Sequence, residues 1–272
     1  MPALNFDQYE VLQVIGAGAH SRVYKVCHRD TRKRFAIKHV VVEDSSADRY
    51  WRQLENEFRM AHDLVHPNVV RVYDLIARKR RLRVAEGYLV MELVRGTPMK
   101  TDPKAYPFAQ LVFYFRQIAD ALAFIHERGI IHTDVKPKNI IITGNHLAKL
   151  VDFGQATHPG TSKGRVQGTF EFMAPEQVHD GILDQRTDIY NLAATMYVML
   201  SGRNPPPVVA ATLGDVDFLP GRTRRPGSIQ ELNPNVTPAL DDLLRNSCSR
   251  NRDERPTTMP EFIERFGEAL PV

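Results

Sequence analysis

The sequence predicts an α+β fold, with a β-rich first part that contains one helix and a larger second part that is mainly helical. Short β-prone runs separated by turns fill most of residues 9–92. Residues 49–64 interrupt these runs with helical periodicity. From residue 108 onward, apolar residues recur at three- and four-residue spacing, which is typical of helices with one buried face.

The composition is that of a folded protein. The 272 residues are 43% hydrophobic and 25% charged, which allows one large domain or two closely packed ones. The net charge of +4 is too small to indicate nucleic-acid binding unless the basic residues form a clustered stripe. We therefore expect no nucleic-acid partner.

Cysteine use and hydropathy predict a cytoplasmic protein without a membrane span. Cys27 and Cys248 are the only cysteines and lie far apart, so the sequence supports neither a disulfide framework nor a zinc site. Residues 1–7 lack the basic-then-apolar pattern of a signal peptide. The longest uncharged apolar stretch, residues 189–202, is shorter than the roughly 18 residues that a span needs, and we interpret it as a buried helix.

The first two predicted strands, residues 9–15 and 23–27, flank a turn that contains Gly16 and Gly18. Glycines let backbone N–H groups approach phosphate oxygens closely. Taken alone, however, the pattern fits an ordinary hairpin turn better.

A strand at residues 35–38 ends in Lys38, and a helix is predicted over residues 49–64. The helix contains two acids, Glu55 and Glu57. Either acid is a candidate ion-pair partner for Lys38, or the acidic face is simply solvated.

Two more strands are predicted at residues 69–76 and 88–92. The basic residues 78–83 that join them are interpreted as a solvated turn. After Glu92 the chain leaves the strand for a turn, where backbone groups without strand partners could hydrogen-bond an adenine.

The predicted helix over residues 108–125 stops at Gly129 and leads into the loop 131–140. This loop places Asp134, Lys136 and Asn139 close together. Asp134 can accept a proton, Lys136 can neutralise an anion, and Asn139 offers a carbonyl oxygen for a hard metal ion. Asp152 follows the next apolar run, so we expect it to face the same site as Asp134, although either loop alone could be an ordinary turn.

The remaining segments are a loop, a connection and closing helices. Residues 155–173 are rich in Gly, Thr and Ser without periodicity, which predicts a mobile loop. Residues 205–235 form a Pro- and Gly-rich connection, and residues 240–248 and 262–270 are predicted helices.

Taken in order, these motifs resemble the eukaryotic-type serine/threonine protein kinases found in bacteria. The resemblance rests on the spacing of Asp134 and Asn139, on Asp152-Phe153-Gly154, and on Ala174-Pro175-Glu176. It implies one bilobal kinase domain over residues 1–272, with an N-lobe at about 9–91, a hinge at about 92–96 and a C-lobe at about 97–270.

The resemblance also implies an ATP site. Lys38 would orient the phosphates, and family spacing favours Glu57 over Glu55 as its partner. Met91 would be the gatekeeper behind the adenine. The other ATP-binding positions that it implies are Ile15, Gly16, Ala17, Gly18, Val23, Ala36, Glu92, Val94 and Ile141.

For the chemistry, the resemblance implies that Asp134 is the base and that Lys136 steadies the γ-phosphate. Asn139 and Asp152 would hold Mg²⁺, with Mn²⁺ as an alternative. Lys136 and the substrate-positioning Thr169 favour Ser/Thr acceptors on protein substrates over tyrosine. Glu176 and Arg255 would form a structural ion pair, and the sequence leaves the oligomeric state open.

Three residues depart from the family pattern. Thr133 replaces the arginine that grips a phosphorylated activation loop in many relatives, so we expect activity without loop phosphate. Ser21 and Ala193 replace glycines and are milder changes. A pseudokinase that binds without turnover is the alternative function, disfavoured because Lys38, Asp134 and Asp152 are all present. A small-molecule kinase of the same fold is a further alternative, disfavoured by the presence of Glu176 and Arg255.

Overall fold

The computed structural model describes residues 8–18, 20–42, 48–80, 83–162, 170–179, 181–205 and 226–271. They divide into two compact units. The first unit comprises Met1–Arg95 and Asp152–Gln155, and the second comprises Gly96–Val151 and Ala156–Val272. One unit is rich in strands and the other in helices, as the predicted α+β class requires.

The first unit is built on a five-stranded antiparallel sheet in the order β1-β2-β3-β5-β4. Its strands are β1 (Tyr9–Ala17), β2 (Ser21–His28), β3 (Arg34–Val41), β4 (Val72–Arg80) and β5 (Arg83–Glu92). Alternate residues of the inner strands face one core, because side chains along a strand point to opposite faces in turn. The buried core cluster comprises Tyr24, Val26, Ile37, Tyr88 and Val90.

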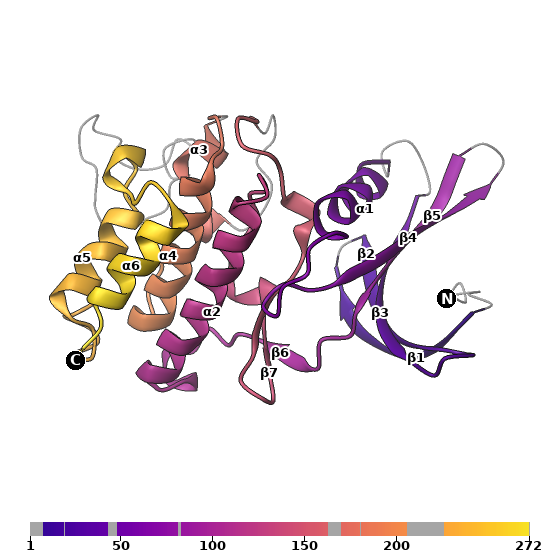
Figure 1. Cartoon of the computed structure of the whole chain (residues 1–272), viewed down its shortest axis with the longest axis horizontal. Helices are drawn as coiled ribbons and strands as arrows, with labels where there is room; N and C mark the ends of the chain where they lie inside the picture. The colour runs from indigo at the N-terminus through magenta and orange to yellow at the C-terminus, as the bar shows by residue number, and fades with distance from the viewer. Residues whose placement is uncertain are drawn as a thin grey trace. The chain divides into compact units, whose positions relative to one another are not determined.

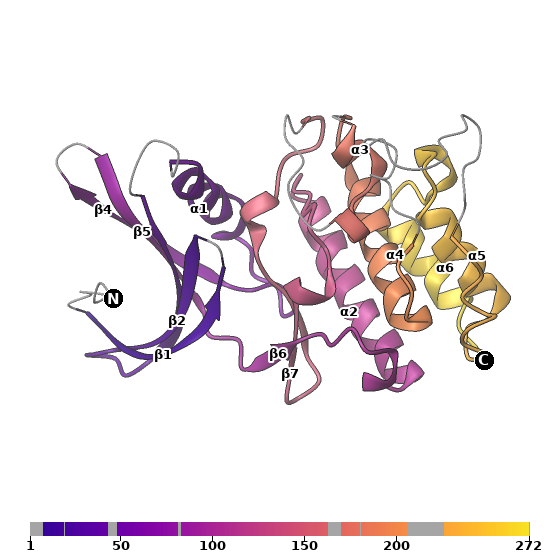
Figure 2. The same cartoon turned by 180° about the vertical axis from the view of Figure 1, so that it is seen from behind.

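Helix α1 (Asp48–Ala61) packs against β3, β4 and β5 (Figures 1 and 2). A side chain at Gly87 of β5 would force the indole ring of Trp51 to move, because its Cβ would lie 2.6 Å from Cε3 of Trp51. The helix ends at Ala61, three residues before the predicted end. Residues 62–64 instead form a turn, in which Leu64 N–H donates to the Ala61 carbonyl at 3.1 Å.

The second unit contains the larger helices and a small sheet. The helices are α2 (Phe108–His126), α3 (Pro175–Val178), α4 (Gln185–Ser201), α5 (Pro238–Ser247) and α6 (Met259–Glu268). The sheet has the order β6-β7-β8, with strands β6 (Gly96–Pro98), β7 (Ile140–Thr143) and β8 (Ala148–Leu150). Helix α4 packs against α2, α5 and α6 (Figure 1), so it forms the centre of this unit.

Helix α4 is longer than the sequence predicts, because it begins at Gln185 rather than at residue 189. The Asp184 carboxylate caps its start by accepting from the Arg186 N–H, and Gly202 ends it with a left-handed backbone at φ 70°. A short polar side chain at the start and glycine just past the end are the usual helix boundaries. Every residue from Thr187 to Leu200 is buried.

Helix α2 follows the predicted apolar face closely. Seven residues between Leu111 and Leu122, together with Ile125, are buried, and the chain turns at Gly129 with φ 66°. Among the described residues, α2 is the one helix long and apolar enough to cross a membrane, with a mean hydropathy of 1.3. It packs against α4, α6 and β8, which is the behaviour of a core helix.

Candidate functional site

An ion-pair cluster in the first unit joins β3, α1 and the segment Asp152–Gln155. Lys38 Nζ donates to Glu57 Oε2 at 2.7 Å and to Asp152 Oδ1 at 3.0 Å. Glu57 is buried on the inner face of α1, whereas Glu55 is exposed on the opposite side. The structure therefore pairs Lys38 with the acid that the family spacing favours.

The two carboxylates keep Lys38 charged. Burial alone would lower the pKa of Lys38, but Glu57 and Asp152 outweigh that effect and raise it above its usual value. A cationic ammonium group held between two carboxylates is suited to bind a phosphate. Asp152 is the more open of the two acids, with 41% of its side chain exposed.

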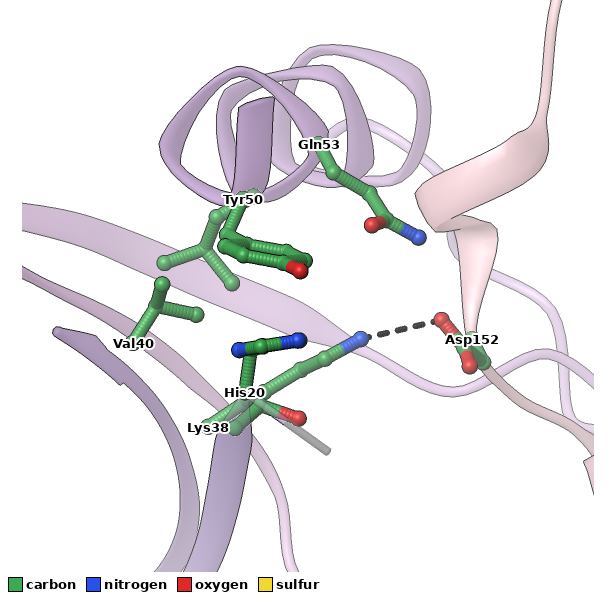
Figure 3. Close-up of a pocket in the computed structure, with 8 residues that line it drawn as sticks. His20, Lys38, Val40, Tyr50, Gln53 and Asp152 are labelled. Carbon is green, nitrogen blue, oxygen red and sulfur yellow. Dashed lines mark hydrogen bonds and ion pairs between the residues drawn. The ribbon is translucent and has the colours of Figure 1, made fainter. Parts of the chain in front are cut away.

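A cavity of about 220 Å³ opens beside this cluster. Figure 3 shows Lys38 and Asp152 on one side of it, with the His20 ring near Tyr50 and Gln53 of α1. The His20 and Tyr50 rings stack with centroids 4.0 Å apart. Sequence reasoning missed both residues, because the stack joins a turn to a helix and neither residue stands in a recognisable pattern.

The turn between β1 and β2 is compact. Gly18 N–H donates to the Ser21 carbonyl at 2.8 Å, and Ile15, Ala17 and Gly18 are exposed. Gly16 is partly buried and pairs across the sheet with Val23, which in turn pairs with Lys38. Register therefore places Gly16 and Val23 in one row with Lys38.

The predicted adenine-binding strand end lies where the pairing of β3 with β5 stops. Ala36 and Met91 are cross-strand partners of β3 and β5, as adjoining positions of one site would be. The prediction concerned backbone groups without strand partners, and the Val94 N–H is such a group, because its acceptor is the Glu92 carbonyl of the same turn at 3.1 Å. Glu92 N–H is also used, since it donates to the Arg71 carbonyl at 2.8 Å.

A second polar cluster lies in the second unit, in the loop before β7. Lys136 Nζ donates to Asp134 Oδ1 at 2.8 Å, and Asn139 Nδ2 donates to Asp134 Oδ2 at 2.8 Å. Asn139 Nδ2 also donates to the Asp134 carbonyl at 2.8 Å. Asp134 therefore has both carboxylate oxygens hydrogen-bonded, and 13% of its side chain is exposed.

The residues predicted to hold a divalent metal fit that role by their donor atoms. Asn139 donates both amide protons to Asp134, which directs its carbonyl oxygen elsewhere as a potential ligand. Mg²⁺ is usually bound by one or two such oxygens together with substrate phosphates and water. No cluster of three His, Cys, Asp or Glu side chains suited to a metal occurs in the described part of the chain. Ile141, partly buried, follows in β7.

Asp134 and Asp152 belong to different units, so their convergence on one site stays a prediction. Their loops share a backbone feature. Asp152 has φ 66°, and Thr133, next to Asp134, has φ 62°. Left-handed backbone is uncommon for residues other than glycine and is often found at functional sites.

A buried carboxylate of α4 supports the Asp134 loop from below. Asp188 Oδ1 accepts from Thr133 N–H at 2.7 Å, and Asp188 Oδ2 accepts from His132 N–H at 2.8 Å. His126 Nε2 lies 2.8 Å from Asp188 Oδ2. Burial alone would raise the pKa of Asp188, but His126 and His132 lower it, so the group is a carboxylate. The sequence analysis assigned Asp188 no role.

Glu176 and Arg255 form the predicted structural pair. Two parallel hydrogen bonds join them, at 2.8 Å and 3.0 Å, and both side chains are buried. Thr187 Oγ1 donates to Glu176 Oε1 at 2.9 Å. Burial alone would raise the pKa of Glu176, but the hydrogen bonds and charge of Arg255 lower it.

The described part of the loop after residue 155 is paired with its surroundings. Thr157 and Ile131 exchange two backbone hydrogen bonds, and Leu183 N–H donates to the Thr161 carbonyl at 2.9 Å. The hydroxyls of Thr157 and Thr161 lie 2.7 Å apart. Thr169, the predicted substrate-positioning residue, lies outside the described residues.

Comparison with known families and proteins gives one consistent answer. The family described as the protein kinase domain matches residues 9–265. A probable serine/threonine-protein kinase of Clostridium perfringens, CPE1738, is 31% identical over 268 residues, which cover 94% of this chain and 37% of that protein.

Two further relatives come from mycobacteria. Serine/threonine-protein kinase PknB of Mycolicibacterium smegmatis is 30% identical, with 94% of this chain and 42% of that protein covered. Serine/threonine-protein kinase PknD of Mycobacterium tuberculosis is 32% identical, with 92% and 38% covered. The chain thus spans well under half the length of these curated relatives.

Proposed function

Because the chain belongs to the protein kinase domain family, we propose that it is a serine/threonine protein kinase that transfers the γ-phosphoryl group of ATP to hydroxyls of proteins. The observation that carries the proposal is the environment of Asp134. Lys136 and Asn139 each donate to one of its carboxylate oxygens, which orients the group as a general base next to a cation.

In the proposed reaction, Asp134 accepts the proton of a serine or threonine hydroxyl as its oxygen attacks the γ-phosphorus. The new oxygen–phosphorus bond forms while the bond from the γ-phosphorus to the bridging oxygen breaks, and ADP leaves. Lys136 neutralises the negative charge on the transferred group. The protein contributes mainly alignment and charge neutralisation, since phosphoryl transfer requires little covalent participation by the enzyme.

Lys38 is proposed to orient the α- and β-phosphates of ATP, held in place by Glu57. The backbone of Gly16 and Gly18 would cover the phosphates, and the strand end at Met91 to Val94 would contact the adenine. For the adenine to bind there, the weak turn between Val94 N–H and the Glu92 carbonyl would have to open. Lys38 acts here as a charge that binds and positions, not as a proton donor.

Asn139 and Asp152 are proposed to hold a divalent metal, Mg²⁺ or Mn²⁺. Such an ion, when bound, neutralises phosphate charge. The exposure of Asp152 and the fixed amide of Asn139 support this assignment. Asn139, Asp152 and Lys38 would then act on the same ATP molecule, as family membership implies.

Substrate class and cellular setting are further proposals. Thr169 and Lys136 together support serine or threonine as the acceptor in protein substrates, and a signalling role follows from that chemistry. The two free, buried cysteines are compatible with a cytoplasmic location for this part of the protein. A pseudokinase is disfavoured because Lys38, Asp134 and Asp152 are all present and hydrogen-bonded.

The test is direct. Purified protein is incubated with labelled ATP and Mg²⁺ in the presence of a general protein substrate, and phosphosites are mapped by mass spectrometry. We expect phosphoserine and phosphothreonine, and no phosphotyrosine. Nucleotide binding without any transfer, with either metal, would instead identify a pseudokinase.

A further inference from the structure

A line of polar side chains runs along the buried helix α4. Asp188, Asn191 and Thr195 are three and four residues apart, so they lie on one face of the helix, and each is at most 1% exposed. Polar groups buried this deeply destabilise a protein unless they are hydrogen-bonded. Their hydrogen-bond partners therefore indicate the structural role of these three side chains.

All three side chains bond to segments that carry the proposed chemistry. Asp188 accepts from the backbone of His132 and Thr133. Thr195 Oγ1 lies 3.2 Å from the Val135 carbonyl and 2.9 Å from the Asn191 carbonyl, so these two acceptors share its one proton. Asn191 Nδ2 donates to the Phe172 carbonyl at 2.6 Å, in the segment that precedes α3.

Gln177 of α3 joins these two segments. Its Nε2 donates to the Thr133 carbonyl at 2.7 Å. Its Oε1 accepts from Ala174 N–H at 2.9 Å and from Asn191 Nδ2 at 2.8 Å. One buried side-chain amide thus bonds to the residue before Asp134, to the segment before α3 and to the centre of α4.

The orientation of Asn191 is fixed by its partners. Both of its amide protons point to acceptors, Phe172 O and Gln177 Oε1. A flipped amide would place Oδ1 against those two acceptors and lose both bonds. Asn191 Oδ1 has no hydrogen-bond partner among the described residues, an energetic cost that the two donated bonds offset.

We propose that Gln177 and Asn191 form an amide lock that positions the Asp134 loop against residues 172–174, in place of the phosphate contact that Thr133 cannot make. The inference rests on the proposed kinase function and concerns how that activity is regulated. The peptide groups on both sides of Asp134 are held at Thr133 N–H, Thr133 O and Val135 O. Gln177 and Asn191 are positioning residues, since they act through the backbone of Thr133 and Phe172.

The chemistry of the lock has a consequence for regulation. A phosphate gripped by an arginine can be added and removed, so it switches a loop between two states. Two neutral amides, buried and bonded to each other, do not respond to a phosphatase. The lock therefore makes the active arrangement of this loop a permanent property of the folded chain.

The experiment compares Gln177→Met and Asn191→Leu with the parent protein. Both changes keep the approximate side-chain size and remove the polar atoms. Asn233→Leu is the matched control, because Asn233 Nδ2 donates to the Leu200 carbonyl at the other end of α4, at 3.0 Å. Each protein is treated with a phosphatase before kcat, the KM for peptide and ATP, and the melting temperature are measured.

We expect kcat to fall at least tenfold in both lock variants, with the KM for ATP changed less than about twofold. The double variant should lose no more activity than the worse single variant, since residues of one network act together. Asn233→Leu should lower the melting temperature and leave kcat near that of the parent. Equal losses of kcat in the lock variants and in this control would show a merely structural role and overturn the inference.

A third variant and a measurement on the parent protein keep the test informative if Gln177→Met or Asn191→Leu fails to fold. Gln177→Glu keeps an acceptor for Ala174 N–H and removes the donor to Thr133 O, so it should still lower kcat. Independently, Ala174 N–H of the phosphatase-treated parent, which donates to Gln177 Oε1, should exchange slowly with solvent deuterium. Rapid exchange there, or a tenfold loss of parent activity on phosphatase treatment, would contradict the lock. A parent protein that is inactive both before and after phosphatase treatment would instead count against the proposed kinase function.

Discussion

Glu57 accepts a 2.7 Å hydrogen bond from Lys38 with only 3% of its side chain exposed. A pair this deeply buried is destabilised strongly when one partner is removed, because the other charge is left without compensation. Asp152 also accepts from Lys38, so the ammonium group would keep one partner without Glu57. Its position, more than its charge, depends on Glu57.

The first prediction concerns this dependence. Glu57→Gln should lower phosphate transfer at least tenfold, because a neutral amide holds Lys38 less tightly and leaves its ammonium group nearer Asp152. Glu55→Gln, two residues away on the exposed side of the same helix, is the control and should retain activity. Steady-state peptide phosphorylation measures both. Retained activity in Glu57→Gln with a loss in Glu55→Gln would reverse the assignment.

The second prediction concerns Asp134. Asp134→Asn should fold and bind ATP with nearly unchanged affinity, yet transfer phosphate several orders of magnitude more slowly, because proton acceptance is lost while positioning largely survives. Calorimetric titration with ATP measures the binding, and single-turnover kinetics measure the transfer. Transfer at the parent rate would remove Asp134 from its proposed role as base.

The third prediction concerns the loop after Asp152. Simultaneous replacement of Thr157, Thr161 and Ser162 by alanine should leave peptide phosphorylation within a few-fold of the parent. These hydroxyls make local contacts, such as Thr161 Oγ1 to the His158 carbonyl at 2.6 Å, while backbone bonds to Ile131 and Leu183 keep the segment in place. A loss of tenfold or more, about 1.4 kcal/mol of transition-state stabilisation, would show that loop phosphate or these hydroxyls matter.

The fourth prediction concerns acid stability. The pKa of Glu176 is lowered in the folded state, so its ion pair stabilises the fold above the unfolded pKa of about 4.3, and this contribution is lost as the pH falls through the lower folded pKa. Glu176→Gln should lower the free energy of unfolding at pH 7 by about 3–5 kcal/mol and flatten its acid dependence. Urea denaturation between pH 3 and 7 tests this, and the exposed Glu264→Gln should behave like the parent.

Elements with strong periodicity could be predicted from the sequence. The five main strands, α1 and α2 follow from alternating or three-to-four spacing, and their boundaries differ from prediction by a few residues. The Lys38–Glu57 pairing was predicted from the family spacing alone, since the residues themselves left Glu55 as an alternative partner. The short strand β6 was not, since it is only three residues long and exists through its pairing with β7.

The polar line in α4 shows most clearly what could not be predicted from the sequence. Asp188, Asn191 and Thr195 are spaced for one helix face, a signal that was present in the sequence. The helix was interpreted only as buried, and its partners come from segments more than ten residues away. Gln177 likewise gave no signal, because its role depends on three hydrogen bonds made by tertiary contacts.

The backbone conformation of Thr133 also lowers the melting temperature of the protein. A β-branched side chain with left-handed backbone, here at φ 62°, destabilises a fold by roughly 1–3 kcal/mol relative to a residue that adopts this conformation freely. Each kcal/mol corresponds to about 2–4 °C of melting temperature in a protein approaching this size. Glycine or asparagine at this position would therefore make a more heat-resistant protein.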